Sequence, residues 1–90
     1  MNFGEAINLL KQGYKMRRKG WNGKGMFIYL VNSSDVPSSA LRGPAKACGE
    51  NKFLVTINSH IDMKAADGSI VVGWLASQSD MLAEDWVVVD

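Results

Sequence analysis

Hydrophobic residues near the N-terminus recur at helical spacing. They are Phe3, Ala6, Ile7, Leu9 and Leu10. This spacing predicts an amphipathic helix over residues 3 to 12 whose apolar face covers one side of a sheet. Asn2 and Glu5 have the spacing of a capping box, and Gly13 stands where such a helix would end.

The period then changes to two, which is typical of strands. Residues 14 to 19 alternate, and beyond a turn residues 26 to 31 form a second strand that is apolar on both faces. A sheet with one wet face does not tolerate such a strand. We therefore expect it either to be central and covered on both sides or to lie in a subunit interface.

The second half of the chain predicts further strands joined by tight turns. The strands cover residues 53 to 58 with a continuation in alternation through 60 to 64, then 69 to 75, and 86 to 89. Asp67-Gly68 is a hairpin signal. Ser77 and Asp80 have the spacing of a capping pair, which predicts a short helical turn that reaches Ala83.

Residues 32 to 51 break the alternation with Ser, Pro and Gly, and they predict a long mid-chain loop. Such a loop is either a functional lid or a mobile excursion. Arg42 and Lys46 lie in it and could reach a phosphate, although single cations in loops are usually solvated. The elements together predict an α+β fold, with one N-terminal helix packed on a small antiparallel sheet of about four to six strands.

The stretch from Arg18 to Phe27 is the most unusual in the chain. It contains the Asn22-Gly23 pair, which predicts the positive-φ geometry of a tight hairpin turn. Trp21 has two interpretations. It is either a core residue that caps the hairpin or, beside neighbouring lysines, a flat platform for a purine that carries phosphates, and at a subunit interface it could be both.

Composition limits the classes of function. Hydrophobic residues are 47% and charged residues 21% of the 90 residues, which indicates one folded domain over residues 1 to 90 rather than a disordered chain. A domain of this size often gains stability by self-association. The formal charge of +1 argues against a DNA or RNA duplex as partner, although the early Lys and Arg residues leave room for a basic rim facing a small anion.

Cysteine and hydropathy patterns add further limits. Cys48 is the single cysteine, so no intrachain disulfide is expected, and no hydrophobic run approaches the length of a membrane span. No secretory segment follows Met1, so we expect a cytosolic protein without a membrane partner. One His and one Cys, distant in sequence, do not suffice for a zinc site within one protomer.

Catalytic candidates are few. His60 and Asp62 are the imidazole and carboxylate closest in sequence, but neighbours on one strand face point in parallel, which argues against an oriented dyad. We expect His60 to bind by hydrogen bonding or stacking. A binding constellation remains, in which Trp21 and Trp74 are ring platforms and Asn22, Ser77, Gln78, Ser79 and Asp80 are hydrogen-bonding groups. It suits a ligand with bases, riboses and a pyrophosphate.

Several stretches resemble a known phage family. They are Met1–Ala6, Arg18–Phe27, His60–Lys64 with Ala66–Gly68, and Trp74–Trp86. In this order they are similar to the Thoeris anti-defence proteins of the second type, a family of signal-molecule sponges. Residues 32 to 51 match that family least.

The resemblance implies a function as well as a fold. It implies a homo-oligomer, expected to be a tetramer, that sequesters a cyclic ADP-ribose signal of the glycocyclic type. TIR-domain Thoeris enzymes of the infected bacterium make this signal, and its capture in the host cytoplasm keeps the effector inactive. Because the signal is held without cleavage, neither an enzymatic activity nor a cofactor or metal is expected.

The resemblance and side-chain chemistry together give the expected ligand-binding residues, namely Trp21, Asn22, Gly23, Met26, His60, Trp74, Ser77, Gln78 and Asp80. Trp21 is expected to stack on the base or line the pocket, and Asn22 and Gly23 to present turn amides. The alternatives are a sponge for the cyclic oligonucleotides of CBASS defence at the same or additional sites, an enzyme that degrades the signal, and a protein that binds another protein through residues 26 to 31.

Overall fold

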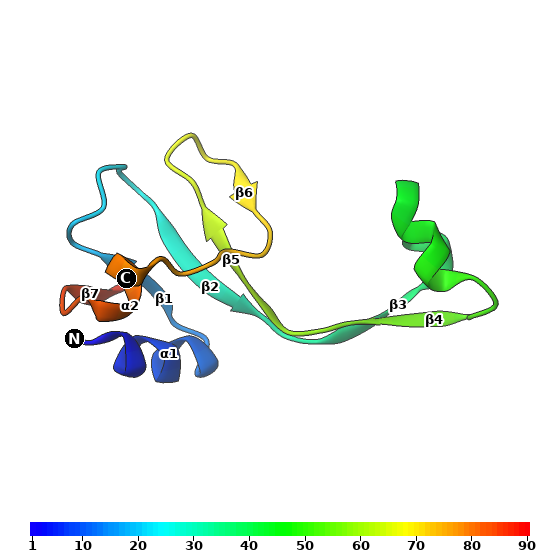
Figure 1. Ribbon diagram of the computed structural model, residues 1–90, viewed down its shortest axis with the longest axis horizontal. Helices are drawn as coiled ribbons and strands as arrows, with labels where there is room; N and C mark the ends of the chain where they lie inside the picture. The colour runs from blue at the N-terminus through cyan, green and yellow to red at the C-terminus, as the bar shows by residue number, and fades with distance from the viewer.

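The computed structural model describes residues 1 to 90 and consists of a body with a long arm (Figure 1). The body contains helices α1 (Phe3–Lys11) and α2 (Gln78–Leu82) and a five-stranded sheet of order β6-β5-β2-β1-β7, in which all neighbours are antiparallel. Its strands are β1 (Lys15–Arg18), β2 (Phe27–Val31), β5 (His60–Lys64), β6 (Ile70–Val71) and β7 (Trp86–Val89). The predicted α+β fold with an N-terminal helix on a small antiparallel sheet is confirmed.

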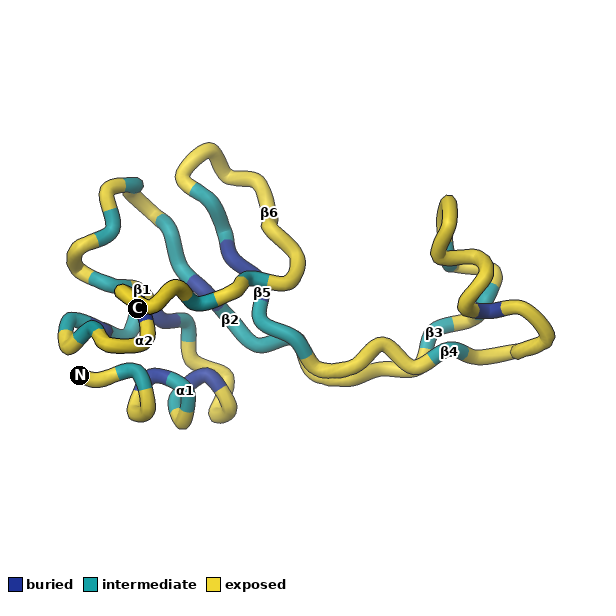
Figure 2. The backbone as a smooth tube through the Cα atoms, in the orientation of Figure 1, coloured by how far each residue is buried: buried dark blue, intermediate teal, exposed yellow.

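Helix α1 covers one face of this sheet, as its spacing predicted. The core between them is formed by Ala6, Leu10, Met16, Ile28, Met63 and Trp86. The four sheet residues come from β1, β2, β5 and β7, so one helix closes the core across most of the sheet. Figure 2 shows that burial is concentrated in this layer between α1 and the strands.

The N-terminus of the chain is bonded to the last strand beside α1. The predicted capping box is confirmed, because Asn2 Oδ1 accepts from the Glu5 N–H at 2.8 Å and Glu5 Oε1 accepts from the Asn2 N–H at 3.1 Å. The Met1 amino group donates to the Trp86 carbonyl at 2.8 Å, and the Trp86 N–H donates to the Met1 carbonyl at 3.1 Å. These bonds tie the start of the helix to the start of β7.

Strand β2 is central in the sheet but has the core on one side only. Ile28 points into the core and is 0% exposed. Phe27, Tyr29 and Val31 alternate with it onto the other side, which we call the open face, and all three are only partly buried. The prediction of cover on both sides is therefore wrong for the single chain, and the interface alternative stays a prediction.

The arm continues the hairpin formed by β2 and β5. Its elements are β3 (Ser34–Pro37), the 3-10 helices η1 (Ser38–Ala40) and η2 (Gly43–Gly49), and β4 (Leu54–Ile57). In the body Val31 pairs with His60. Three residues further along, Ser34 pairs with Ile57, so the register runs without a slip from the body into the arm. The arm makes the molecule 46 Å long against 26 and 25 Å in the other two directions.

Several predicted segments differ from the structure. Residues 32 to 51, predicted as a long loop, include β3 and both 3-10 helices. The predicted strand over residues 69 to 75 is paired only at β6, because Gly73 turns the chain with a φ of +80°. The Asp67-Gly68 hairpin between β5 and β6 is confirmed, with a φ of +90° at Gly68.

The predicted tight turn at Asn22-Gly23 is wrong. Neither residue has a positive φ, and the left-handed position is Gly25, with a φ of +75°. Residues 19 to 26 instead form a wide loop between β1 and β2. This loop extends beyond the strand ends and forms one wall of the pocket described below.

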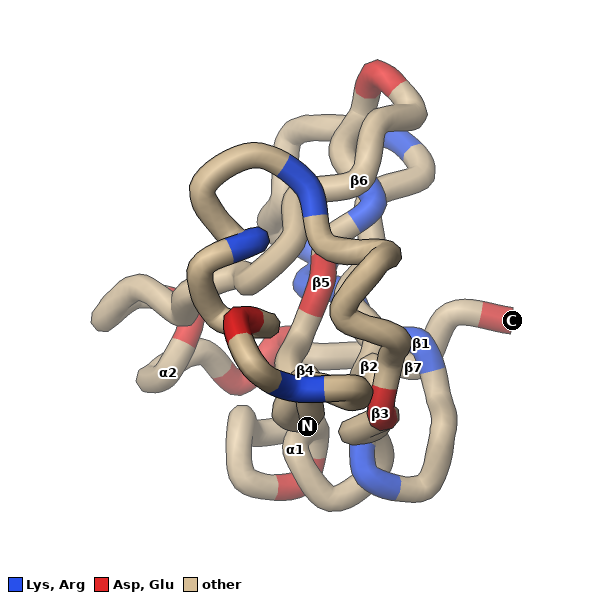
Figure 3. Tube along the Cα trace, turned by 90° about the vertical axis from the view of Figure 1, so that its right-hand side faces the viewer, with Lys and Arg blue, Asp and Glu red and all other residues tan.

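Many hydrophobic side chains remain outside the core. Only 9 of the 90 residues are buried, and Phe53 and Leu75 are 87% and 88% exposed. Phe53 lies at the end of the arm, and Leu75 lies between β6 and α2. The single chain thus leaves apolar surface on both the arm and the body. In the view from the arm tip, charged residues of both signs are spread over the molecule (Figure 3).

Candidate functional site: a basic pocket beside a tryptophan cluster

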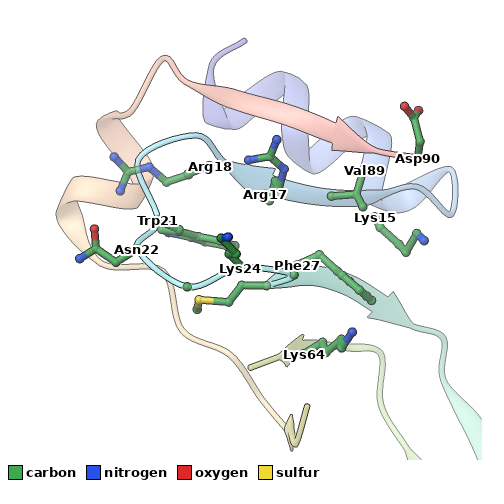
Figure 4. A pocket seen from close by; sticks show the side chains of 13 residues that line it. Lys15, Arg17, Arg18, Trp21, Asn22, Lys24, Phe27, Lys64, Val89 and Asp90 are labelled. Atoms are coloured by element: carbon green, nitrogen blue, oxygen red, sulfur yellow. The ribbon is translucent and has the colours of Figure 1, made fainter. Parts of the chain in front are cut away.

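The largest pocket, about 550 Å³, lies where the loop of residues 19 to 26 meets the open face of the sheet. We call it the loop pocket. It is lined by Lys15, Arg17, Arg18, Trp21, Asn22, Gly23, Lys24, Gly25, Met26, Phe27, Lys64, Val89 and Asp90. Figure 4 shows strand residues forming its floor, while Trp21 and Lys24 come from the loop. The alternation of β1, β2 and β5 brings these floor residues to one face.

Positive charge dominates the loop pocket. Lys15, Arg17, Lys24 and Lys64 line it without forming an ion pair, and Asp90 is its one carboxylate. Cations that line a cavity without an ion-pair partner favour an anionic ligand, because the anion supplies the opposite charge.

Phe27 stands between two of these cations. Lys15 Nζ lies 5.1 Å and Lys64 Nζ lies 5.5 Å from the centre of the Phe27 ring. Each cation is attracted by the ring, yet the two repel each other. An anion bound by both lysines at the edge of the ring would offset that repulsion, which favours a ligand that carries phosphate.

Three tryptophans form the wall behind the loop. The ring centres of Trp21 and Trp86 are 5.4 Å apart, those of Trp21 and Trp74 are 6.2 Å apart, and all three pairs meet edge to face. Trp86 is 0% exposed, whereas Trp21 is partly exposed and lines the pocket. One part of the Trp21 ring thus packs on the core and another borders the cavity, so packing on the core is confirmed and the role as a platform for a purine stays a prediction.

Asp80 joins this cluster to helix α2. Its Oδ1 accepts from Arg18 Nη1 at 2.9 Å and from Trp21 Nε1 at 3.4 Å. Its Oδ2 accepts from the Ser77 N–H at 3.0 Å, and its own N–H donates to Ser77 Oγ at 3.1 Å, so the predicted capping pair is confirmed. The Asp80 carbonyl accepts from Trp86 Nε1 at 2.9 Å. Burial alone would raise the pKa of Asp80, but the bonds from Ser77, Arg18 and Trp21 lower it below its usual value.

The expected ligand-binding residues fall into separate groups. Four of them, Trp21, Asn22, Gly23 and Met26, line the loop pocket. Trp74 packs against Trp21 without lining it. Ser77 and Asp80 bond to each other around the start of α2, and Gln78 is exposed on that helix. His60 lies at the opposite end of β5 from Lys64, next to the arm.

His60 and Asp62 do meet, contrary to the expectation that they point in parallel. His60 Nε2 is 3.4 Å from Asp62 Oδ1, and His60 Nδ1 is 2.8 Å from the Asn58 carbonyl. Asp62 Oδ1 also accepts from the Gly73 N–H at 3.0 Å. Both ring nitrogens of His60 therefore lie near a partner within the chain, and the role of His60 in ligand binding stays a prediction.

Sequence reasoning missed much of the pocket floor. The missed residues are Phe27, Lys64, Val89 and Asp90, whereas Lys15 and Arg17 belong to the early basic residues that left room for a basic rim. Alternation alone could have assigned each to a strand face, but only the pairing of β2 with β1 and β5 brings those faces together. The loop cations Arg42 and Lys46, which could have reached a phosphate, lie on the arm instead.

The structure contains neither a metal-ligating cluster nor a helix that could cross a membrane. The structure contains no group of three or more His, Cys, Asp or Glu side chains that could hold a metal ion. Cys48 is exposed on η2. Neither helix has the length and apolar character needed to span a bilayer.

Comparison with known proteins adds an independent finding. Residues 1 to 89 match the family of Thoeris anti-defense 2-like domains. The chain is also 43% identical over 89 residues to Thoeris anti-defense 2 of Bacillus phage SP01, and the alignment covers 99% of this chain and 94% of that protein. Since both matches extend over nearly the whole chain, they include the loop, the sheet and the arm.

Proposed function

The chain belongs to the Thoeris anti-defense 2 family, as its resemblance predicted, and from that premise we propose that it captures the Thoeris signal in the loop pocket without cleaving it. The family gives a phage anti-Thoeris role. The proposed ligand is a cyclic ADP-ribose isomer of the glycocyclic type, made by a TIR-domain enzyme. Capture in the cytoplasm of the infected bacterium would keep the effector inactive.

The chemistry of the loop pocket carries this proposal. A cyclic ADP-ribose isomer has a pyrophosphate, two riboses and a purine, so it needs cations beside an aromatic surface. The pocket offers Lys15, Arg17 and Lys64 around Phe27 on its floor and the ring of Trp21 on its wall. Charge-assisted bonds to phosphate and ring stacking together supply affinity for this class of ligand.

The composition of the pocket supports binding without turnover. Hydrolysis requires a nucleophile or an activated water with a matched base. The lining contains no Ser, Thr, Cys, His or Tyr, and its one carboxylate is Asp90. The lining therefore lacks the hydroxyl or thiol nucleophile paired with a histidine base that many hydrolases use.

We further propose that the protein works as a homo-oligomer, expected to be a tetramer. The body leaves Ile70, Val72 and Leu82 at 61%, 71% and 77% exposed, and the arm leaves Phe53 at 87%. Apolar surface of this kind marks an association surface in a stable protein. A second copy that covers the open pocket would also slow release of the ligand, which a stoichiometric inhibitor requires.

A titration followed by recovery of the ligand tests the proposal. Purified protein is incubated with glycocyclic ADP-ribose at known ratios, separated from free ligand, heated to unfold it, and the released molecule is identified by mass spectrometry. The proposal expects stoichiometric depletion and release of intact ligand. It also expects a ligand-dependent rise in melting temperature, because a ligand that binds only the folded state stabilises it.

Other outcomes separate the alternatives. A linear product, or depletion by substoichiometric protein, would identify an enzyme. Depletion of a cyclic dinucleotide but not of the cyclic ADP-ribose isomer would identify a CBASS signal as the ligand. If neither ligand raises the melting temperature, a protein partner for the open face becomes the better explanation.

A further inference from the structure

Arg18 joins two carboxylates that lie on different segments of the chain. Its Nη1 is 2.9 Å from Asp80 Oδ1 in helix α2, and its Nε is 2.9 Å from Asp85 Oδ1 just before β7. Arg18 is the last residue of β1 and pairs with Trp86, so it stands where the loop of residues 19 to 26 begins. The guanidinium extends toward α2, away from the other cations of the pocket (Figure 4).

Asp85 also holds the loop backbone. Its Oδ2 accepts from the Gly20 N–H at 2.8 Å, and its carbonyl accepts from the Lys19 N–H at 3.1 Å. The Trp21 N–H donates to the Arg18 carbonyl at 3.3 Å, which completes a turn leading to the tryptophan. The first two residues of the loop are thus bonded to one residue that does not line the pocket, Gly20 to its carboxylate and Lys19 to its backbone carbonyl.

We propose that Arg18 and Asp85 are positioning residues that hold Trp21 at the pocket wall before the ligand arrives. We call the bonds among Arg18, Asp80 and Asp85 the clamp. This inference rests on the proposed function for its ligand, and it deepens that function by separating residues that contact the ligand from residues that prepare the site. A loop that is already held in its binding conformation loses less conformational entropy when the ligand binds, and this raises the affinity.

Asp80 connects the clamp to the tryptophan ring. The same oxygen, Oδ1, accepts from both Arg18 and Trp21 Nε1. If Arg18 leaves this oxygen, the carboxylate keeps the bond that its Oδ2 accepts from the Ser77 N–H, but Oδ1 loses the cation that holds it beside the indole. The Trp21 ring then keeps its apolar contacts with Trp74 and Trp86 but loses its orientation.

The clamp specifically requires an arginine. A guanidinium presents donors in a fixed plane and can bond two carboxylates at once, whereas a lysine is a point charge on a flexible stem. Both carboxylates are partly shielded from solvent, with Asp80 12% and Asp85 32% exposed at the side chain. The bond that Arg18 donates also lowers the pKa of Asp85, and the bonds that Asp85 and then Asp80 accept raise the pKa of Arg18.

The test compares Asp85→Asn with Glu84→Gln. Each variant removes one carboxylate at neighbouring positions, but no bond is formed by the Glu84 side chain. Nitrogen-proton NMR resolves the indole signals of the three tryptophans in the ligand-free protein, and a Trp21→Phe variant assigns that of Trp21. Exchange of each indole proton with water and affinity for glycocyclic ADP-ribose are then measured for both variants.

We expect the Trp21 indole proton of Asp85→Asn to shift and to exchange faster with water, with the Trp86 signal unchanged and affinity about tenfold weaker. Glu84→Gln should match the unmodified protein. An unmoved Trp21 signal or unchanged affinity in Asp85→Asn would overturn the inference, and so would a uniform change of all three indoles, which is the mark of a general loss of stability.

Two further results remain decisive. If Asp85→Asn does not fold, Arg18→Lys is measured in the same way, and a normal Trp21 signal in this variant would overturn the inference. If the unmodified protein does not bind glycocyclic ADP-ribose, the proposed function fails, whereas the indole signals of the ligand-free variants still decide whether the clamp holds Trp21.

Discussion

Asp80 shows how much of a residue's role its sequence neighbours reveal. Its spacing from Ser77 predicted a capping pair, and both bonds of that pair are present. The same residue was also expected to contact the ligand. Its two carboxylate oxygens already accept from Ser77, Arg18 and Trp21, so within the single chain Asp80 supports the wall of the loop pocket.

Lys64 provides the residue-scale test of the charged floor. Lys64→Met keeps most of the side-chain length but removes the charge beside Phe27, so we expect about tenfold weaker binding of glycocyclic ADP-ribose. Added salt should weaken binding less in the variant than in the unmodified protein, because one screened interaction is missing. Calorimetric titration at two salt concentrations measures both effects.

Lys46→Met is the matched control for that measurement. Lys46 lies on η2 in the arm and does not line the loop pocket, so its loss should leave the affinity unchanged. Equal affinity of Lys64→Met and the unmodified protein would show that the ligand does not use this part of the pocket.

Gly23 is constrained by space rather than by its backbone angle. A Cβ at this position would overlap the Met26 side chain and lie 2.7 Å from the Ala66 Cβ. We therefore expect Gly23→Ala to lower the free energy of unfolding by about 1–3 kcal/mol, the usual cost of overpacking. Thermal or urea unfolding measures the change.

Gly4→Ala is the opposite control. A Cβ on Gly4 would meet nothing closer than 3.4 Å, and the residue lies in α1, so alanine should stabilise the protein by up to about 1 kcal/mol. If the two substitutions have equal effects, the close packing of Gly23 is not what determines its identity.

At the level of elements, charged side chains join helix α2 to the end of β1 and to the segment just before β7. Helix α2 has only five residues, and its buried residue is Asp80. Arg18 connects this helix to Asp85. Alternation and the spacing of Ser77 and Asp80 predicted these elements one by one, whereas the bonds that hold the three together join residues more than 60 positions apart.

Acid should loosen this junction. Burial opposes ionisation of Asp80, yet hydrogen bonds leave its folded-state pKa below the usual value, and the Arg18 bond lowers that of Asp85. A carboxylate with a lowered folded pKa contributes stability that is complete above its unfolded pKa, roughly 3.9 for Asp. That contribution is lost as the pH falls through the folded pKa.

We therefore expect the free energy of unfolding to fall as the pH is lowered below about 4, and to fall less steeply in Asp85→Asn. Urea unfolding at several pH values measures both slopes. Asp67, whose pKa is lowered by its bonds from Ser69, titrates in the same window in both proteins, so the difference between the slopes isolates Asp85. Parallel slopes would contradict the assigned role of the Asp85 carboxylate.

At the scale of the whole molecule, the arm and the body have separate roles. No core residue lies between Asn32 and Ser59, and the arm is a two-stranded ribbon with a 3-10 tip. An isolated two-stranded ribbon is marginal in water. Together with exposed Phe53, this makes the arm an expected place of contact between copies of the chain.

Removing the arm tests this division. Val31 pairs directly with His60, so Asn32–Ser59 can be replaced by an Asn-Gly pair that closes a two-residue hairpin. We expect the shortened chain to unfold cooperatively, because its core is intact, and to associate more weakly than the full chain. Circular dichroism and analytical ultracentrifugation measure these properties. Loss of the folded body, or unchanged association, would contradict the division.

Local sequence patterns were sufficient to predict the periodic elements, namely the capped helix α1, the alternating strands, the Asp67-Gly68 hairpin and the capping pair of α2. Helical and strand periods depend on neighbours a few residues apart, so the chain order contains them. Family membership also followed from local stretches. These are features that a short segment specifies without knowing where the rest of the chain lies.

The meeting of particular strand faces depends on how the whole chain folds. The basic pocket and the clamp depend on it in turn. Lys15, Phe27 and Lys64 gather because β1, β2 and β5 pair in one register, and Arg18 reaches Asp80 and Asp85 because the chain returns to β1 at its end. Strand pairing and long-range ion pairs depend on how the whole chain buries its apolar surface, which no local pattern encodes.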